Sequence, residues 1–254
     1  MSMRIAIAGK GGTGKTTVAA LLCRSLLNRG TKPLLAVDAD PNSCLPDKLG
    51  VAREKTIGEL REELRADPEK MPAGISKSEW IESLINQEIS ESTGFDMVVM
   101  GRQEGPDCYC FINNLLRQCL DKLGSQYEAV VIDNEAGLEH LSRRSNGTVE
   151  VLLVVCQPTL IGARTALRIV ELSKSLNLDI GNSYLILNAC DGELSDELVA
   201  EFEKSGLEIA ARIPTDSEIL DFELEDKSLT ELSDDSVAAL AGDDIIERIF
   251  KEVQ

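Results

Sequence analysis

The chain has 254 residues, of which 43% are hydrophobic and 28% charged, a balance typical of a folded globular protein. Its formal net charge of −18 argues against broad binding to nucleic acid or anionic lipid, because both require cationic protein surfaces. No apolar run is long enough to span a membrane, and the first residues lack the features of a signal peptide. We therefore expect a cytoplasmic protein.

Short apolar segments alternate with longer helix-like segments along the chain. The short segments are rich in Leu and β-branched residues and lack a polar face, as buried parallel strands do. This alternation predicts one α/β domain spanning residues 1–254, with a mostly parallel sheet of about seven or eight strands and helices on both faces. Strands are predicted over residues 4–8, 34–38, 97–101, 129–133, 151–155, 184–188 and 208–213, and helices over 16–29, 112–123, 163–176 and 196–205.

Two regions depart from this alternation. Residues 45–95 are polar and predict an insertion of short helices beside the site rather than a second domain. Residues 237–254 carry apolar side chains at helical spacing, opposite a mostly acidic face that is unfavourable at an anionic membrane. We therefore expect this helix to pack on the sheet through its apolar residues, which are Leu240, Ile245, Ile246, Ile249, Phe250 and Val253.

The sequence GKGGTGKTT lies between the first predicted strand and the first predicted helix. It matches the phosphate-loop pattern in the context that the pattern requires. In such a loop, backbone N–H groups surround phosphate oxygens, the lysine reaches the β- and γ-phosphates, and the next hydroxyl binds Mg²⁺. Lys15 and Thr16 take the last two roles. The predicted phosphate-binding residues are Gly11, Gly12, Thr13, Gly14, Lys15, Thr16 and Thr17.

An additional lysine, Lys10, makes this loop resemble the deviant Walker A motif. That motif occurs in the family of the nitrogenase iron protein, the MinD/ParA-type ATPases and the metal-insertion ATPases. The resemblance implies an ATP-dependent homodimer in which Lys10 crosses to the partner's nucleotide and acts in catalysis with Lys15. The added positive charge would stabilise the transition state as an arginine finger does. The alternative interpretation is a solvated surface lysine.

Two acidic segments follow predicted strands. The sequence VDADPN resembles the first switch of this family, in which Asp38 matches a carboxylate associated with Mg²⁺ and Asp40 matches the catalytic residue that activates water. The sequence VVIDNEAG resembles the second switch, in which Asp133 would hold Mg²⁺ and Gly137 would sense the γ-phosphate. Carboxylates suit these roles because in-line attack needs a proton acceptor and Mg²⁺ prefers oxygen ligands.

Weaker signals follow the last two predicted strands. Asn188 ends one strand, and the sequence IPTD, which contains Pro214 and Asp216, ends the next. Both resemble the adenine-side segments of the family, which assigns these three residues to nucleotide binding. The alternative is that they are ordinary polar residues at strand ends.

Seven cysteines make a poor disulfide framework in a reducing compartment, because the count is odd. Cys108 and Cys110 share one face of an extended segment, so the same pair from a second copy would complete a four-sulfur site. Such a site suits Zn²⁺, Ni²⁺ or an iron–sulfur cluster. The remaining cysteines are expected to be packing residues: Cys23, Cys44, Cys119, Cys156 and Cys190.

The Cys-Tyr-Cys run, the segment GLEHLSR and the phosphate loop together resemble the CooC-type nickel-insertion ATPases. This resemblance implies a homodimer that uses Mg²⁺ and ATP, holds Ni²⁺ or Zn²⁺ between Cys108 and Cys110 of two subunits, and serves carbon monoxide dehydrogenase or acetyl-CoA synthase. Two alternatives stay open, an iron–sulfur electron-transfer ATPase like the nitrogenase iron protein and a positioning ATPase of the MinD/ParA type. His140 fits either a position in the hydrophobic core or one in contact with the metal ligands without binding the metal itself.

Overall fold

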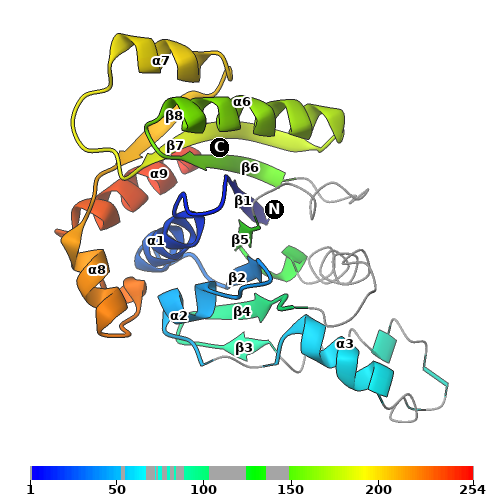
Figure 1. Cartoon of the computed structure of the whole chain (residues 1–254). Coiled ribbons are helices and arrows are strands. Elements are labelled where there is room, and N and C mark those ends of the chain that lie inside the picture. The colour runs from blue at the N-terminus through cyan, green and yellow to red at the C-terminus, as the bar shows by residue number, and fades with distance from the viewer. Residues whose placement is uncertain are drawn as a thin grey trace.

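The computed structural model describes residues 2–52, 55–66, 72, 74–75, 79–80, 83, 89–102, 124–135 and 149–253. Its centre is an eight-stranded sheet in the order β3-β4-β2-β5-β1-β6-β7-β8 (Figure 1). Seven strands pair in parallel, and the two-residue edge strand β3 (Ser90–Glu91) runs antiparallel to β4. The predicted α/β fold with a mostly parallel sheet is confirmed.

The strands lie close to their predicted positions. Strand β8 has the bounds predicted for residues 208–213. Strand β7 begins four residues before the predicted strand 184–188, and β4 lies two residues closer to the N-terminus than the predicted strand 97–101. Polar or small residues open β7, so its pairing with β6 extends the strand beyond the apolar run. The parallel strands are β1 (Met3–Ala8), β2 (Leu34–Ala39), β4 (Phe95–Val99), β5 (Ala129–Asn134), β6 (Val149–Cys156), β7 (Ile180–Asn188) and β8 (Glu208–Ile213).

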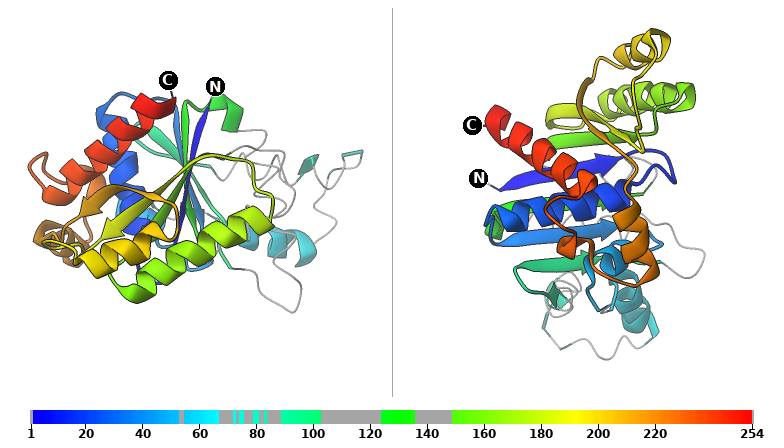
Figure 2. Two further views of the ribbon diagram at one scale, coloured as in Figure 1. Left: turned by 90° about the horizontal axis from the view of Figure 1, so that it is seen from above. Right: turned by 90° about the vertical axis from the view of Figure 1, so that its left-hand side faces the viewer.

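Helices cover both faces of the sheet, as predicted (Figure 2). Helices α1 and α9 pack on one face, and α6 and α7 pack on the other over β1, β6 and β7. Helix α3 covers β2, β4 and β5 through Ile57 and Leu60. The predicted helix over 112–123 lies outside the described residues. The described helices are α1 (Lys15–Asn28), α2 (Leu45–Leu49), α3 (Ile57–Ala66), α6 (Leu160–Ser175), α7 (Asp196–Glu203), α8 (Ser217–Leu224) and α9 (Val237–Val253), with 3-10 turns η2 (Gly124–Gln126) and η3 (Leu229–Glu231).

Helix α9 packs on the sheet as expected. Ile245, Ile246 and Ile249 are buried against the core, and Phe250 is partly buried there. Leu240 departs from the prediction, since 49% of it is exposed in the first turns of the helix. Among the described residues, no helix combines the length and the apolar character needed to cross a membrane.

A buried arginine fixes the orientation of α1, the helix that follows the phosphate loop. Arg24 is 1% exposed and donates from Nε and Nη2 to the Leu232 carbonyl at 3.2 and 3.0 Å. Its Nη2 also lies 2.5 Å from the Asp234 carboxylate. Because hydrogen bonds and an ion pair compensate this charge, α1 is held firmly to the segment before α9.

Three of the cysteines expected in the core are buried, namely Cys23, Cys156 and Cys190. Cys44 contradicts the same expectation, because it is exposed at the N-cap of α2. It lies in the loop between β2 and α2, whereas Leu45 beside it takes the buried position. Cys119 lies outside the described residues.

Candidate functional site

The predicted nucleotide-binding residues gather at one edge of the sheet. Because β1, β2, β5, β6, β7 and β8 run parallel, the loops after them meet at the edge formed by their carboxyl ends. The phosphate loop follows β1 at the centre of the sheet, with β5 on one side and β6 on the other. This central position lets residues from several neighbouring strands approach a ligand bound to the loop.

The phosphate loop closes around one of its own carbonyl groups. The Lys10 carbonyl accepts hydrogen bonds from the Thr13 hydroxyl at 2.9 Å and the Thr13 backbone N–H at 3.4 Å. The Lys15 ammonium donates to the same carbonyl at 3.5 Å, and only 7% of Lys15 is exposed. Lys10 itself is exposed. The two predicted catalytic lysines therefore differ: Lys15 lies within the loop, whereas Lys10 is accessible to another molecule.

Two glycines let the loop approach neighbouring strands. Gly14 adopts φ +89° at the N-cap of α1, and a Cβ there would lie 2.1 Å from the Asn188 side-chain nitrogen. Asn188 donates from that nitrogen to the Thr13 carbonyl at 2.9 Å. A Cβ on Gly9 would lie 2.3 Å from the Val155 carbonyl of β6. In the structure Asn188, predicted on the adenine side, supports the phosphate loop.

Asp38 is a fully buried carboxylate held by backbone N–H groups. Its Oδ1 accepts from the Asp40 N–H at 3.0 Å, and its Oδ2 accepts from the Leu45 N–H at 2.9 Å. Burial raises the pKa of Asp38 to about 7, although these hydrogen bonds oppose the rise. The Leu45 contact, which sequence reasoning missed, joins Asp38 to the first residue of α2.

Asp133 lies beside Asp38, since the two are register partners on β5 and β2. It is 1% exposed, and within the described part of the chain no backbone N–H group donates to either carboxylate oxygen. Burial raises its pKa to about 6, while the nearby Thr16 hydroxyl and Lys15 ammonium lower it in part. A buried carboxylate that no backbone group holds, next to a second carboxylate and a hydroxyl, fits a magnesium ion.

We predict that Asp133→Asn stabilises the nucleotide-free chain at alkaline pH. The folded-state pKa lies above the usual value, so the folded chain holds this proton more tightly, and its contribution to stability falls as pH rises from about 4 to 6. Removing the charge should raise the free energy of unfolding at pH 8 by about 1–3 kcal/mol, or roughly 2–10 °C in melting temperature. Thermal unfolding in a chelator tests this prediction.

The pH dependence separates this effect from a general improvement in packing. At pH 4.5 Asp133 is already largely protonated in the folded chain, so Asp133→Asn should change the melting temperature far less there. Asp47→Asn, which alters an exposed carboxylate on α2, serves as the matched control and should have no effect at either pH. An equal shift at both pH values would contradict the prediction.

Asp40 lies in the loop after β2 and shapes that loop. Its Oδ1 accepts from the Asn42 backbone N–H at 2.8 Å and from the Asn42 side-chain nitrogen at 2.9 Å. Arg102 in turn donates from Nη2 to the Asn42 side-chain oxygen at 3.1 Å. Asp40 is half-buried, so its carboxylate is positioned by the turn while part of it stays accessible.

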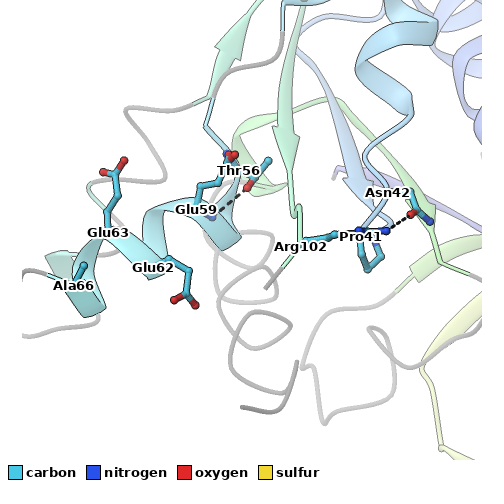
Figure 3. A pocket seen from close by; sticks show the side chains of 8 residues that line it. All are labelled: Pro41, Asn42, Thr56, Glu59, Glu62, Glu63, Ala66 and Arg102. Carbon is cyan, nitrogen blue, oxygen red and sulfur yellow. Dashed lines mark hydrogen bonds between the residues drawn. The ribbon is translucent and has the colours of Figure 1, made fainter. Parts of the chain in front are cut away.

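A pocket of 670 Å³ adjoins this loop (Figure 3). No phosphate-loop residue lines it, and three glutamates of α3 give it an acidic wall, so it is not a phosphate site. The capping pair of Thr56 and Glu59 fixes the start of α3, because each accepts from the other's backbone N–H, at 3.1 and 2.7 Å. The lining residues are Pro41, Asn42, Thr56, Glu59, Glu62, Glu63, Ala66 and Arg102.

The loop after β8 holds the other two residues predicted to bind nucleotide. Asp216 caps α8 by accepting from the Glu218 N–H at 2.9 Å, and it accepts from Ser236 at 2.7 Å and from the Ala238 N–H at 3.1 Å. Burial would raise the pKa of Asp216, but these bonds outweigh it and lower the pKa, which gives Asp216 a structural role at the start of two helices. Pro214 is half-buried in the same loop.

Four predicted residues lie outside the described residues: Cys108, Cys110, Gly137 and His140. Within the described part of the chain, no group of three or more His, Cys, Asp or Glu side chains is arranged to hold a metal ion. Sequence reasoning also missed Asn134, which is fully buried after Asp133 and donates to the Ile7 carbonyl of β1 at 2.9 Å. A second polar residue directly after Asp133, at the end of the apolar run, is the signal that identifies it.

Comparisons with known proteins identify a matching family model, relatives in sequence and a matching fold. Residues 5–229 match the model of the CobQ/CobB/MinD/ParA nucleotide binding domain. The chain is 40% identical over 253 residues to an uncharacterised ATP-binding protein of Methanocaldococcus jannaschii, covering 98% of this chain and 99% of that protein. It is 30% identical over 190 residues to the carbon monoxide dehydrogenase accessory protein CooC of Rhodospirillum rubrum, covering 69% and 71%. The crystal structure of the Pyrococcus furiosus cell division ATPase MinD matches all of both chains with a TM-score of 0.71 at 22% identity.

Proposed function

Because this chain belongs to the CobQ/CobB/MinD/ParA nucleotide-binding family, we propose that it is a homodimeric metallochaperone driven by ATP. Its cargo is Ni²⁺, with Zn²⁺ as the competing ion, held between Cys108 and Cys110 of two subunits. The recipient is a nickel enzyme such as carbon monoxide dehydrogenase or acetyl-CoA synthase. Hydrolysis of ATP supplies the conformational change that releases the metal.

The ATPase core of this proposal is supported by the family and by the geometry of the site. The chain is an ATP-binding P-loop protein of the MinD/ParA type. Lys15 is directed back into the loop, toward the position where backbone N–H groups and the start of α1 favour phosphate. Asp40 lies in the adjacent loop and is the group assigned to accept a proton from the attacking water.

Three oxygen-bearing side chains suit the magnesium ion that accompanies ATP in this family. We assign Asp133, Thr16 and Asp38 to it, with Asp133 as the principal carboxylate because, unlike Asp38, it is held by no backbone N–H group among the described residues. When bound, magnesium neutralises phosphate charge and lowers the barrier to displacement at the γ-phosphate. Its positive charge would lower the pKa of both carboxylates, so nucleotide with magnesium should bind better above pH 7.

The dimeric part of the proposal depends on Lys10. Its exposure on a loop whose other lysine points inward leaves it available to a second subunit. On this arrangement the partner's Lys10 approaches the nucleotide, and binding of ATP brings the two subunits together. Gly137 would act as the residue that responds to the γ-phosphate in each subunit.

One observation carries the nickel assignment: the 30% identity to CooC in a chain that also contains Cys108 and Cys110. Thiolates are soft ligands that bind Ni²⁺ and Zn²⁺ strongly. Two cysteines per subunit are too few for a closed site, and twofold symmetry would supply the other two. The cargo site is therefore expected to exist only in the dimer.

Replacing both cysteines tests this proposal directly. We predict that the native chain binds about one Ni²⁺ per dimer in ATP, whereas Cys108→Ala with Cys110→Ala loses this site. Equilibrium dialysis with Ni²⁺, combined with light scattering, measures metal and dimer together. Cys44→Ala, which removes an exposed cysteine elsewhere, is the matched control and should retain the metal.

The same experiment separates the alternatives. Unchanged nickel binding by the double variant would exclude the two-cysteine site. An iron–sulfur absorption band near 400 nm in anaerobically purified protein would instead favour an electron-transfer ATPase. ATP-dependent sedimentation with anionic vesicles or DNA, without metal binding, would favour a positioning ATPase of the MinD type.

A further inference from the structure

Helix α8 exposes two large apolar side chains that the rest of the fold does not cover. Leu220 is 57% exposed and Leu224 is 77% exposed, and their i,i+4 spacing places them on one face of the helix. Ile219 and Phe222 point the other way and pack against the core. The right-hand view of Figure 2 places α8 on the side facing the viewer, away from the sheet. Its outer face is thus an apolar strip available to another molecule.

The surroundings of this strip are strongly acidic. Residues 216–235 contain nine acidic residues and one lysine, a net charge of −8 out of −18 for the whole chain. Asp221 stands between the two leucines in sequence, and Glu225 and Asp226 follow the helix. A surface that combines exposed leucines with concentrated negative charge is complementary to a molecule that combines apolar groups with positive charge.

Two basic side chains from outside this segment neutralise part of its charge: Arg24 pairs with Asp234 beyond the helix, and Lys48 pairs with a glutamate of α8 itself. Lys48 of α2 forms an ion pair with Glu223 of α8. Lys48 and Glu223 are 21% and 39% exposed, so the pair lies near the surface. Removing Lys48 would therefore leave Glu223 free and make the α8 surface more negative without disturbing the two leucines.

We propose that the outer face of α8 is a docking surface for a cationic amphipathic helix of another protein. Leu220 and Leu224 contact the apolar face of that helix, and the surrounding carboxylates contact its lysines or arginines. Helices of this kind bind to a surface through side chains spaced three and four residues apart, which matches the spacing of the two leucines. The proposal is independent of the metal that the ATPase carries.

A synthetic probe tests both parts of the recognition. The probe is a fluorescein-labelled 18-residue helical peptide of leucine and lysine, and its counterpart replaces every lysine by glutamate. Fluorescence anisotropy should show that the full chain binds the lysine peptide and does not bind the glutamate peptide. Leu220→Ser with Leu224→Ser should weaken binding of the lysine peptide at least about tenfold, because the apolar contact is lost while all charges remain.

Two variants keep this test decisive. Leu160→Ser with Ile161→Ser removes another exposed apolar pair, which is 45% and 61% exposed on α6, and should leave binding unchanged. Lys48→Ala should strengthen binding about two- to fivefold, a gain that partial unfolding would not produce. Equal losses for the two serine pairs would overturn the proposal, since attraction would then be general. Concentration-dependent dimerisation that Leu220→Ser with Leu224→Ser abolishes would also overturn it, because a second copy would be the occupant.

Discussion

Asp40→Asn is expected to lower the rate of ATP hydrolysis by about 10²–10⁴ while leaving ATP binding unchanged. A positioned proton acceptor contributes acceleration of this size. Asparagine keeps the side-chain oxygen that accepts from Asn42, so the turn after β2 should survive the change. The Asp40→Asn variant therefore loses the carboxylate but keeps the conformation of the loop. Single-turnover hydrolysis and nucleotide titration measure the two effects separately.

The matched control for Asp40→Asn is Asp47→Asn, seven residues later on α2. It removes the same charge from an exposed position outside the loop and should hydrolyse ATP at the native rate. If Asp40→Asn also weakened ATP binding by a factor similar to its loss of rate, Asp40 would be a residue that shapes the loop. Hydrolysis at the native rate would remove it from the catalytic assignment.

Lys10→Ala is expected to reduce ATP turnover by about 10³–10⁵, the range known for a cation delivered in trans to the transferring phosphate. Lys15 remains in the loop in this variant, so each subunit should still bind nucleotide. The loss should appear in turnover and in ATP-dependent dimerisation. Lys32→Ala, at an exposed lysine before β2, controls for the change in net charge.

Mixing two inactive variants shows whether Lys10 acts across the dimer. In a mixed dimer, the subunit with Lys10→Ala keeps its own Asp40 and receives the partner's Lys10. One of the two nucleotide sites of the mixed dimer is therefore complete. Equal mixing with Asp40→Asn should therefore restore turnover, up to a ceiling of about a quarter of the native value, which is reached when half of the dimers are mixed. A lysine acting within its own subunit would give no recovery.

Most of the sheet could be predicted from the sequence because its strands are buried on both faces. Continuous apolar runs ending in polar residues located Asp38 and Asp133, and the structure aligns these two as register partners. What the sequence could not supply is the set of contacts between distant segments. Asn188 supports the phosphate loop through Thr13, and Leu45 holds Asp38, and neither contact has a local sequence signal.

Helix α8 shows most clearly what could not be predicted from the sequence. No residue of α8 is fully buried, so it lacks the apolar periodicity that identifies a core helix. Its start is instead fixed by Asp216, which a resemblance assigned to nucleotide binding and which caps the helix in the structure. The same aspartate also bonds to Ser236 and Ala238. Capping contacts of this kind depend on the tertiary arrangement of two segments as much as on local sequence.

The position of β1 at the centre of the sheet sets the order in which the protein can mature during synthesis. Met3 pairs with Ala129 of β5, and Ile5 pairs with Val151 of β6, so β1 can pair only after strands much later in the chain have been made. Arg24 likewise meets Leu232 only after the chain has been extended by a further 208 residues. A nascent chain thus contains its phosphate loop long before β5 and β6, the strands on either side of β1, have been made. The phosphate loop gains its contact with Asn188 only once a residue 175 positions beyond Thr13 has been made.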